Sequence, residues 1–245
     1  MTKRVAIFGA TSAIAQAFAR RYATQSARFF LVGRTPDRVD AVAADLRVRG
    51  AAEVTTALAD FSDSDCRALC DAAKRSLGTI DIALVAHGQL TDQPSCETDS
   101  AKLQETFDVN FLSHAQLLLG LANTLEAQGS GSLVAIGSAA GDRGKASNYV
   151  YGSAKAGIAV LQQGLMARMR GKGVHVLLVK PGFVDTPMTS EFKKGLLWIG
   201  PDRAAASIVA AINAKRTTIY VPFFWRYIML GLRALPDAVF VRLGL

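Results

Sequence analysis

Two residues of this chain, Tyr151 and Lys155, have types and a spacing that could do chemistry. They lie in a Gly/Ala/Ser-flanked segment that can be helical, and a separation of four residues puts both side chains on one helical face. A free phenol has a pKa of about 10, and a fixed positive charge beside it stabilises the phenolate and lowers that pKa. The pair therefore predicts a phenol that acts as a general acid or base. Taken alone, the spacing also fits an exposed helix surface.

A third candidate is Ser138, thirteen residues before Tyr151. It directly follows the apolar run 132–137, which predicts a buried strand. A hydroxyl at the carboxyl end of such a strand could meet the phenol over a substrate carbonyl. The three residues together predict a site of proton transfer.

The elements that must position these residues alternate along the chain. The predicted strands are 3–8, 28–32, 53–58, 80–85, 132–137, 174–179 and 217–221. The predicted helices are 13–25, 37–49, 62–77 with Ser62 as its cap, 100–128, 149–170 and 201–215. Strict alternation of this kind predicts an α/β fold, with a doubly wound, seven-stranded parallel sheet and helices on both faces.

The first strand ends in Gly9-Ala10-Thr11-Ser12, and a predicted helix follows from Ala13. A strand, a tight glycine turn and a helix form the arrangement in which backbone N–H groups and a helix N-terminus face a pyrophosphate. The turn therefore predicts a phosphate-binding site.

Length and composition limit the classes of protein to consider. The chain has 245 residues, half of them hydrophobic, which predicts one large α/β domain over 1–222 with an extension at 223–245. Its formal charge of +8 indicates an anionic partner, either a phosphate-rich cofactor or a membrane surface. Nucleic acid is not expected, because the basic residues are dispersed and no binding module is recognisable.

Targeting signals and metal sites are not expected. The N-terminus has no secretory signal, and no uncharged apolar stretch is long enough to span a bilayer. The three cysteines, Cys66, Cys70 and Cys96, have no Cys/His cluster beside them, so reduced thiols and no metal are expected. These features predict a cytoplasmic protein.

Several segments, taken in order, resemble the short-chain dehydrogenase/reductase family over about 3–221. They are Gly9 to Ala15, Asp60, Ala86-His87-Gly88, Asn110, the group Ser138, Tyr151 and Lys155, and Pro181 to Thr186. The resemblance implies a Rossmann fold and hydride transfer between a nicotinamide and a carbonyl or secondary alcohol. It also implies a homodimer or homotetramer, paired through the helices before and after the fifth strand.

The resemblance implies a role for each matching residue. Tyr151 would donate the proton, Ser138 would hold the substrate oxygen, and Asn110 would position a water that continues the proton relay past Lys155. The implied cofactor-binding residues are Gly9, Thr11, Ser12, Ala13, Ile14, Arg34, Asp60, Phe61, Ala86, His87, Gly88, Tyr151, Lys155, Pro181, Gly182, Val184 and Thr186. Thr186 and Lys155 would anchor the nicotinamide and its ribose.

The chain departs from the family pattern at three positions. Ala13 and Ala15 stand where the family usually has glycine for close backbone approach, which raises the alternative of a non-enzymatic cofactor-binding sensor. The four matching catalytic residues argue against that alternative. His87 stands where the family usually has a small residue, and a structural filler is favoured over a catalytic histidine because Tyr151 already supplies the proton chemistry.

The end of the second strand indicates which nicotinamide cofactor is used. An acid there favours NAD, whereas a basic side chain favours the 2′-phosphate of NADP. The chain has Arg34 there, with Arg38 close behind, so NADP is preferred. NAD remains possible if Arg34 stacks on adenine or lies in solvent.

The extension 223–245 has an unusual composition. Aromatic residues gather at its start, Arg226 and Arg233 are seven residues apart, and Pro236 predicts a division into two short helices. An amphipathic helix of this kind suits the surface of a membrane. The alternative is an extension that packs over the substrate pocket or at a subunit interface.

Together with segment 148–157, the extension is similar to the keto-reductase components of decaprenylphosphoryl-ribose 2′-epimerases. This resemblance implies reduction of a polyprenylphosphoryl-2-keto-ribose to the arabinose form, with the protein on the inner face of the membrane. Those relatives are associated with NADH, which conflicts with Arg34. The alternative is a soluble reductase of another carbonyl, such as a 3-oxoacyl compound. The sequence leaves the substrate, direction and oligomer size open.

Overall fold

Seven parallel strands form a single sheet in a computed structural model that describes residues 2–62 and 65–243. The strands are β1 (Arg4–Phe8), β2 (Arg28–Gly33), β3 (Glu53–Leu58), β4 (Ile82–Val85), β5 (Gly131–Ile136), β6 (Val174–Pro181) and β7 (Thr218–Val221). Their order is β3-β2-β1-β4-β5-β6-β7, so the winding reverses between β1 and β4. The predicted doubly wound sheet is confirmed. Ligands of such sheets bind beyond the carboxyl ends of the strands at this reversal.

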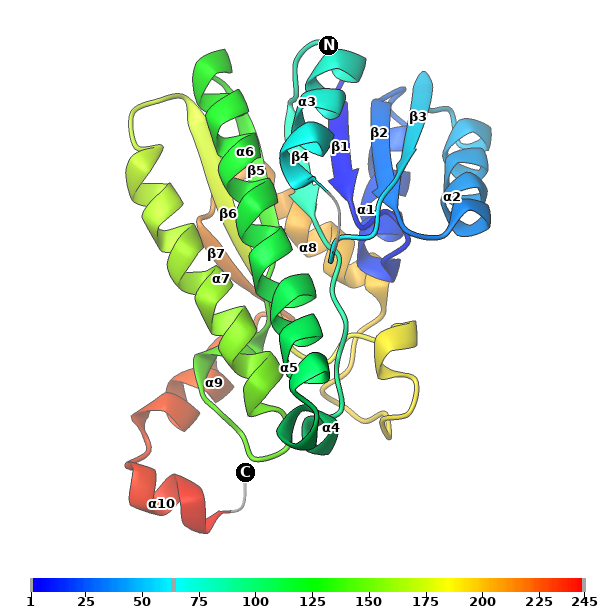
Figure 1. The fold of residues 1–245 in the computed structure, drawn as a ribbon. Coiled ribbons are helices and arrows are strands. Elements are labelled where there is room, and N and C mark those ends of the chain that lie inside the picture. Colours follow the sequence, from blue (N-terminus) through cyan, green and yellow to red (C-terminus); the bar gives the residue numbers. More distant parts are fainter. Residues whose placement is uncertain (1, 63–64, 244–245) are drawn as a thin grey trace.

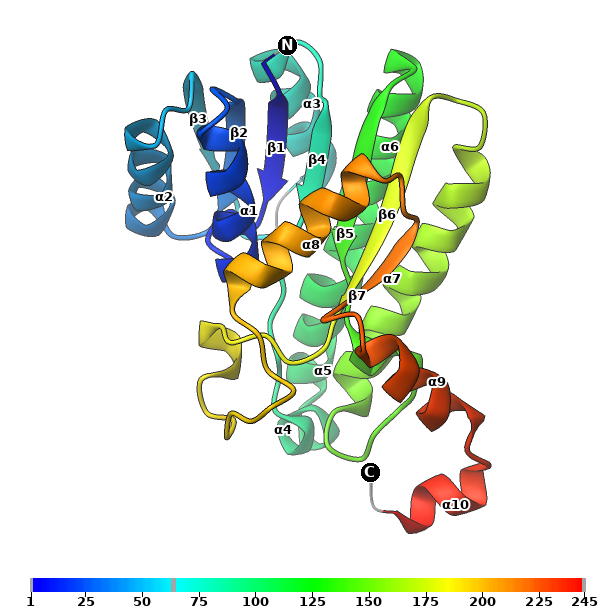
Figure 2. The same cartoon turned by 180° about the vertical axis from the view of Figure 1, so that it is seen from behind.

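Helices cover both faces of the sheet (Figures 1 and 2). One core cluster joins the sheet to α1 (Ala13–Ala23), α2 (Pro36–Val48) and α8 (Pro201–Asn213). The other joins it to α3 (Cys66–Leu77), α6 (Ser113–Gln128) and α7 (Tyr149–Arg168). Residues 5–8 of β1 and all of β4 are continuous apolar runs, as expected for strands that are covered on both faces.

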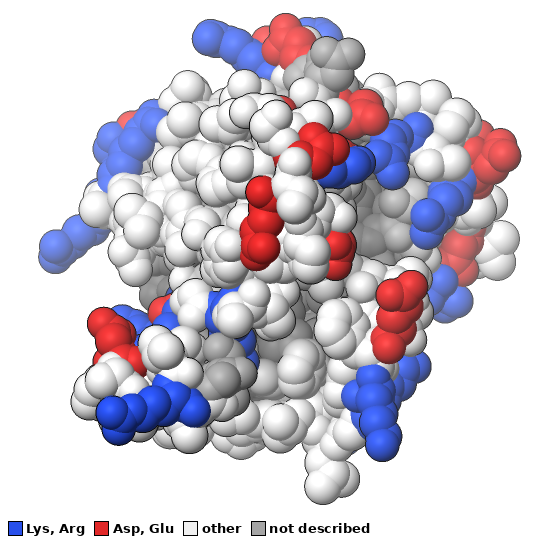
Figure 3. All heavy atoms as spheres, turned by 60° about the horizontal axis from the view of Figure 1, so that its bottom comes forward, with Lys and Arg blue, Asp and Glu red and all other residues white. Residues whose placement is uncertain are grey.

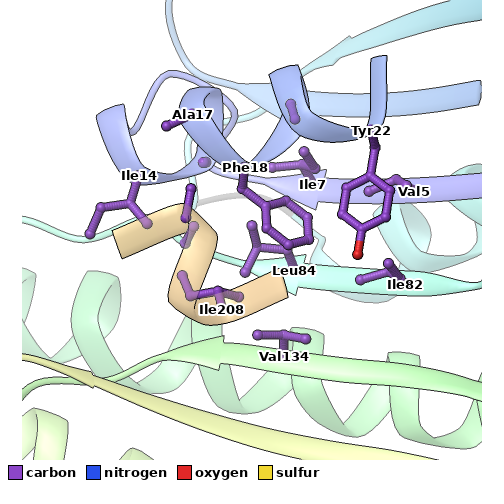
Figure 4. Packing of buried hydrophobic residues seen from close by; sticks show 14 of the residues in the cluster. Val5, Ile7, Ile14, Ala17, Phe18, Tyr22, Ile82, Leu84, Val134 and Ile208 are labelled. Carbon is purple, nitrogen blue, oxygen red and sulfur yellow. The ribbon is translucent and has the colours of Figure 1, made fainter. Parts of the chain in front are cut away.

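The core beneath α1 holds the glycine turn in place. Phe18 is fully buried, and Figure 4 shows it among Ile7 of β1, Leu84 of β4 and Ile208 of α8. Fully burying a side chain of this size contributes about 1.5–3 kcal/mol. The packing therefore fixes the start of α1 against the carboxyl end of β1.

The predicted helix over 100–128 is wrong as one element, because it is divided into three. α5 (Ser100–Phe107) leads into a wide π-helical turn, η1 (Asp108–Leu112), and α6 follows. In this turn the side-chain amide of Asn110 donates to the carbonyl of Thr106, and Ser113 Oγ donates to that of Val109. Side chains that insert into the backbone ladder in this way widen a helix.

Two helix starts also differ from prediction. α3 begins at Cys66, where the Asp65 side chain accepts hydrogen bonds from the first turn, whereas the predicted cap Ser62 donates to Asp60. Residues 63–64 of that predicted helix lie outside the described residues. A short helix, α4 (Gln93–Thr98), occupies a region predicted as loop, and Asp92 caps it by accepting from the N–H of Ser95. The other predicted boundaries shift by only a few residues.

The C-terminal extension forms two helices, α9 (Trp225–Ala234) and α10 (Asp237–Arg242), with Pro236 between them as predicted. Arg143 fastens them to the loop after β5. Its guanidinium donates to the carbonyls of Leu232 and Leu235 at 2.6 and 2.7 Å and pairs with Asp237 at 2.8 Å. Residues 244–245 of the predicted extension lie outside the described residues. Among the described helices, none combines the length and apolar character that crossing a bilayer requires.

The three cysteines are buried free thiols. Burial raises the pKa of Cys66 to about 11 and that of Cys70 to about 12, so both stay protonated at neutral pH. Within 2–62 and 65–243, no three His, Cys, Asp or Glu side chains gather in a way that could hold a metal ion.

Candidate active site

A pocket of about 430 Å³ lies at the carboxyl ends of the strands, where the winding of the sheet reverses. Its walls come from the turn after β1, the loops after β2 to β6, the first turns of α7, and α9. Nearly all the residues predicted for the site line it. They are Gly9, Thr11, Ser12, Ala13, Ile14, Arg34, Asp60, Phe61, Ala86, His87, Gly88, Ser138, Tyr151, Lys155, Pro181, Gly182, Val184 and Thr186. Asn110 does not line it, because it lies behind Gly88.

Ser138, Tyr151 and Lys155 meet at one part of this pocket. Ser138 follows β5 and begins the short helix η2 (Ala139–Asp142), where its Oγ accepts from the N–H of Ala140 at 3.1 Å. Tyr151 lies in the first turn of α7, and Lys155 follows one turn later. The Lys155 ammonium nitrogen is 5.8 Å from the centre of the Tyr151 ring. The helical spacing therefore brings the two side chains together as predicted.

The charges at this part of the pocket differ from the prediction. Burial raises the pKa of Tyr151 to about 12, although the Ser138 hydroxyl acts to lower it. Burial also lowers the pKa of Lys155 to about 7. The predicted lowering of the Tyr151 pKa is therefore wrong, because removal from water disfavours both the phenolate and the ammonium ion. At neutral pH the phenol carries its proton.

Asn110 is fully buried and holds the segment after β4. Its Oδ1 accepts from the N–H of Gln89 at 3.1 Å, and its Nδ2 donates to the carbonyls of Gln89 and Thr106, each at 3.0 Å. A Cβ at Gly88 would lie 3.0 Å from Asn110 Oδ1 and 3.3 Å from Lys155 Nζ. Asn110 and Lys155 therefore approach each other only because position 88 has no side chain. The implied role of Asn110 in a water relay stays a prediction, and both ends of its amide are already engaged.

The turn after β1 can hold a phosphate group. Gly9 has φ of +91°, and a Cβ there would lie 2.4 Å from the backbone nitrogen of His87, so only glycine fits. Ser12 makes no side-chain bond to the first turn of α1, and residues 11–14 line the pocket. The N–H groups that begin α1 are therefore available to an anion. Ala15 is fully buried in the core, and Ala13 lines the pocket, so the fold accommodates both methyl groups.

Two arginines line the part of the pocket after β2. Arg34 lies 3.9 Å from the carboxylate of Asp60, which is held in turn by the hydroxyl and N–H of Ser62. These hydrogen bonds, together with Arg34, lower the pKa of Asp60. Arg38 lines the same region. The donor set therefore fits an anionic group such as a phosphate on a ribose.

His87 packs as a structural residue. Its ring stacks on Phe61 with centres 3.9 Å apart, lies 4.0 Å from the ring of His114, and is 2.8 Å from Ser113 Oγ through Nε2. Burial and the charge of Lys155 hold the pKa of His87 well below its usual value. A neutral, stacked ring agrees with the predicted filler role. The contact with His114 comes from α6 and could not be read from the sequence.

An apolar wall that was not predicted from the sequence completes the pocket. It consists of Phe183, Met188, Phe192, Trp225 and Met229. Trp225 lies against Gly182, where a Cβ would be 2.2 Å from the indole nitrogen. Phe183 meets Trp225 edge to face at 5.0 Å. One face of the C-terminal extension therefore covers the pocket, which was the alternative to membrane binding. The aromatic cluster at the start of the extension was the available indication.

Comparisons with known proteins agree with this geometry. A family model described as short chain dehydrogenase matches residues 3–196. An uncharacterized oxidoreductase of Mycobacterium tuberculosis (strain ATCC 25618 / H37Rv) is 37% identical over 241 residues, covering 98% of this chain and 96% of that protein. The ketoacyl reductase HetN of Nostoc sp. is 27% identical over 224 residues, covering 89% of this chain and 78% of that protein.

A solved structure of an actinorhodin polyketide ketoreductase variant with NADPH shares the fold, with a TM-score of 0.80 and 20% identity. The match covers 92% of this chain and 99% of that one. The alternative of a non-enzymatic sensor is set aside, because the family match and the oxidoreductase relatives support an enzyme. This chain belongs to the short-chain dehydrogenase family and is an oxidoreductase.

Proposed function

We propose that this oxidoreductase uses NADPH to reduce the 2-keto group of a polyprenylphosphoryl-linked ribose, giving the arabinose form. The observation that carries the proposal is the composition of the pocket. Ser138, Tyr151 and Lys155 meet inside it, and the C-terminal extension adds an apolar wall beside them. The three polar residues suit a carbonyl group, and the apolar wall suits a substrate with an apolar part.

The residues around the pocket fit a phosphorylated dinucleotide. The start of α1 would hold the pyrophosphate, Arg34 and Arg38 the 2′-phosphate, and Lys155 and Thr186 the ribose and nicotinamide. The reduced nicotinamide, when bound, supplies the hydride. The preference for NADPH over NADH rests on the two arginines.

Tyr151 and Ser138 complete the reduction. The Tyr151 phenol keeps its proton at neutral pH because burial raises its pKa to about 12. It is therefore in the form that donates a proton to the carbonyl oxygen, while the Ser138 hydroxyl donates a hydrogen bond to the same oxygen. The ketone becomes a secondary alcohol, and the phenolate left behind recovers its proton from solvent through Lys155. The reverse reaction uses the same groups.

A second candidate substrate is a 3-oxoacyl compound. The relatives favour it, because a 3-oxoacyl-[acyl-carrier-protein] reductase of Bos taurus is 26% identical over 197 residues, covering 80% of this chain and 82% of that protein. The apolar wall suits an acyl chain as well as a polyprenyl chain. Similarity of the C-terminal extension to the lipid-linked sugar reductases favours the first candidate.

The test is loss of absorbance at the reduced-nicotinamide band. NADPH and NADH would each be offered a polyprenylphosphoryl-2-keto-ribose and, separately, a 3-oxoacyl thioester. The control is Tyr151→Phe, which keeps the buried ring and removes the proton, so we expect a folded protein with at least a thousandfold lower turnover. Turnover of the thioester alone would replace the first substrate with the second. A variant of normal rate would overturn the assignment of Tyr151.

A further inference from the structure

Two exposed apolar segments lie on either side of the pocket mouth, and nothing in the proposed chemistry uses their outer surfaces. One is residues 183–197, here named the loop lip, and the other is residues 223–243, the tail lip. We propose that the two lips together dock the protein on an anionic lipid bilayer, with the pocket opening onto the membrane. The membrane's role in substrate delivery rests on the proposed function, whereas the docking itself does not.

The tail lip has two apolar faces, and the pocket accounts for only one. Trp225 and Met229 point inward and are 6% and 1% exposed. Tyr227 and Leu230, three residues apart on one side of α9, are 65% and 63% exposed, and Phe223 in the turn before the helix is 74% exposed. Large apolar side chains that gather on one outer surface mark a site of contact with a partner or a membrane.

The loop lip presents a second apolar group across the mouth. Leu196 is fully exposed, and Phe192 and Met188 are 48% and 44% exposed. Met188 and Phe192 also line the pocket, as Trp225 and Met229 do from the tail lip, so the two lips border the same opening. Figures 1 and 2 show both segments at the end of the molecule where the strands finish. A flat apolar surface could therefore contact both lips at once.

The charges beside these side chains fit an anionic surface. Arg226, Arg233 and Arg242 are all exposed on the tail lip, and its one acidic residue, Asp237, is paired with Arg143. In the view of Figure 3, basic side chains lie on both sides of this end of the molecule, and acidic side chains lie beside them and near the middle of the face. Inserted apolar groups flanked by arginines match the layer where acyl chains meet anionic headgroups.

The tail lip is held in place before any contact with lipid. Arg143 bonds the carbonyls at the end of α9 and lies over the ring of Phe240 at 4.1 Å. The exposed apolar surface of the tail lip is therefore already formed and oriented, which lowers the entropy cost of binding. In this position a lipid-linked substrate could keep its chain in the bilayer while its sugar reaches Ser138 and Tyr151.

The test is flotation of the full chain with vesicles of phosphatidylcholine, alone or mixed with phosphatidylglycerol. Variants Tyr227→Glu/Leu230→Glu and Leu196→Glu each alter one lip outside the pocket lining. The matched control is Val48→Glu, since Val48 is 89% exposed on α2, away from the lips. We expect each lip variant to lower binding to the mixed vesicles about tenfold or more, and the control to leave it unchanged. Arg226→Gln/Arg233→Gln should remove most of the gain from phosphatidylglycerol.

Three results would overturn the proposal. They are no flotation of the unaltered chain, equal flotation of the lip variants and the Val48→Glu control, or a lip-dependent self-association in place of vesicle binding. The two proposals fail separately. Vesicle binding without reduction of the lipid-linked sugar would leave the docking surface and remove the substrate. Lip variants that do not float with vesicles would also be tested on a short-chain, water-soluble 2-keto sugar. If they reduce it at the normal rate, only docking was lost.

Discussion

At the scale of single residues, burial affects the pKa values of Tyr151 and Lys155 more than the pairing of their charges does. Tyr151 and Lys155 are adjacent, yet burial moves their pKa values toward the neutral forms, to about 12 and about 7. A protonated phenol suits reduction of a carbonyl, because the carbonyl oxygen must receive a proton when the alcohol forms. The residue types predict proton transfer, and burial in the interior of the protein decides which protonation state of each side chain is favoured.

Lys155 should make stability depend on pH. Its folded-state pKa of about 7 is below the ordinary lysine value of 10.5, so the unfolded chain binds more protons between these values and stability rises with pH in this range. Above about pH 9 the raised pKa values of Cys66, Cys70 and Tyr151 oppose and then reverse the trend, because these groups ionise first in the unfolded chain. Urea unfolding at about pH 7.5 and about pH 8.5, below the range where the unfolded cysteines ionise, should show the rise, and Lys155→Met should flatten it. An equal rise in the variant would show that another group is responsible.

Arg34 and Arg38 should determine the choice of cofactor. Replacing both by Gln removes two positive charges from the wall of the pocket, one of them beside Asp60, so we expect KM for NADPH to rise about tenfold to a hundredfold and KM for NADH to change little. The measurement is initial rate against the concentration of each cofactor. Equal increases for both cofactors would mean that the arginines contact a part that the two share, and NADP would no longer be preferred.

At the scale of elements, the site depends on close packing between segments distant in the chain. The loop after β6 carries Gly182, and α9 from the C-terminal extension places Trp225 directly against it. The turn η1 places Asn110 behind Gly88, where Lys155 arrives from α7. Because Gly88 and Gly182 have no side chain, the elements on either side can approach closely. Even a methyl group at either position should therefore disrupt the site.

Gly182→Ala should detach the start of α9. The added methyl would lie 2.2 Å from the Trp225 indole nitrogen, too close for any contact, so the indole must move toward solvent. We expect a red shift of tryptophan fluorescence and a higher KM for the carbonyl substrate. The same substitution in a Trp225→Phe background is the control, because only Trp198 then remains in the chain. A red shift of the same size in that background would place the change at Trp198.

At the scale of the whole molecule, one end of the sheet carries all the recognised chemistry. The pocket, the loop lip and the tail lip gather where the strands end, while the outer sides of α6 and α7 carry exposed apolar residues. Leu119 and Val160 are 43% and 68% exposed there. Function and assembly are therefore expected on different surfaces, with pairing through α6 and α7 as the family resemblance implies.

Val160→Glu should lower the oligomeric state. A charge at the centre of a paired helix surface is costly to bury, so we expect the mass in solution to fall toward that of the 26.0 kDa chain, as measured by light scattering after gel filtration. Tyr227→Glu on the tail lip serves as the control, since it changes an exposed apolar residue outside these helices. A dimer or tetramer of unchanged mass would exclude pairing through this surface.

The sequence by itself determined the sheet, its alternating helices and the residue types at the site. The apolar runs of β1 and β4, the turn at Gly9 and the spacing of Tyr151 and Lys155 are local patterns, and local patterns report periodicity and backbone conformation. Only the tertiary structure decided the apolar wall from α9, the stack of Phe61, His87 and His114, and the direction in which the pKa values of Tyr151 and Lys155 shift. These depend on desolvation and on contacts between distant segments, and neither is encoded in the spacing of residues along the chain.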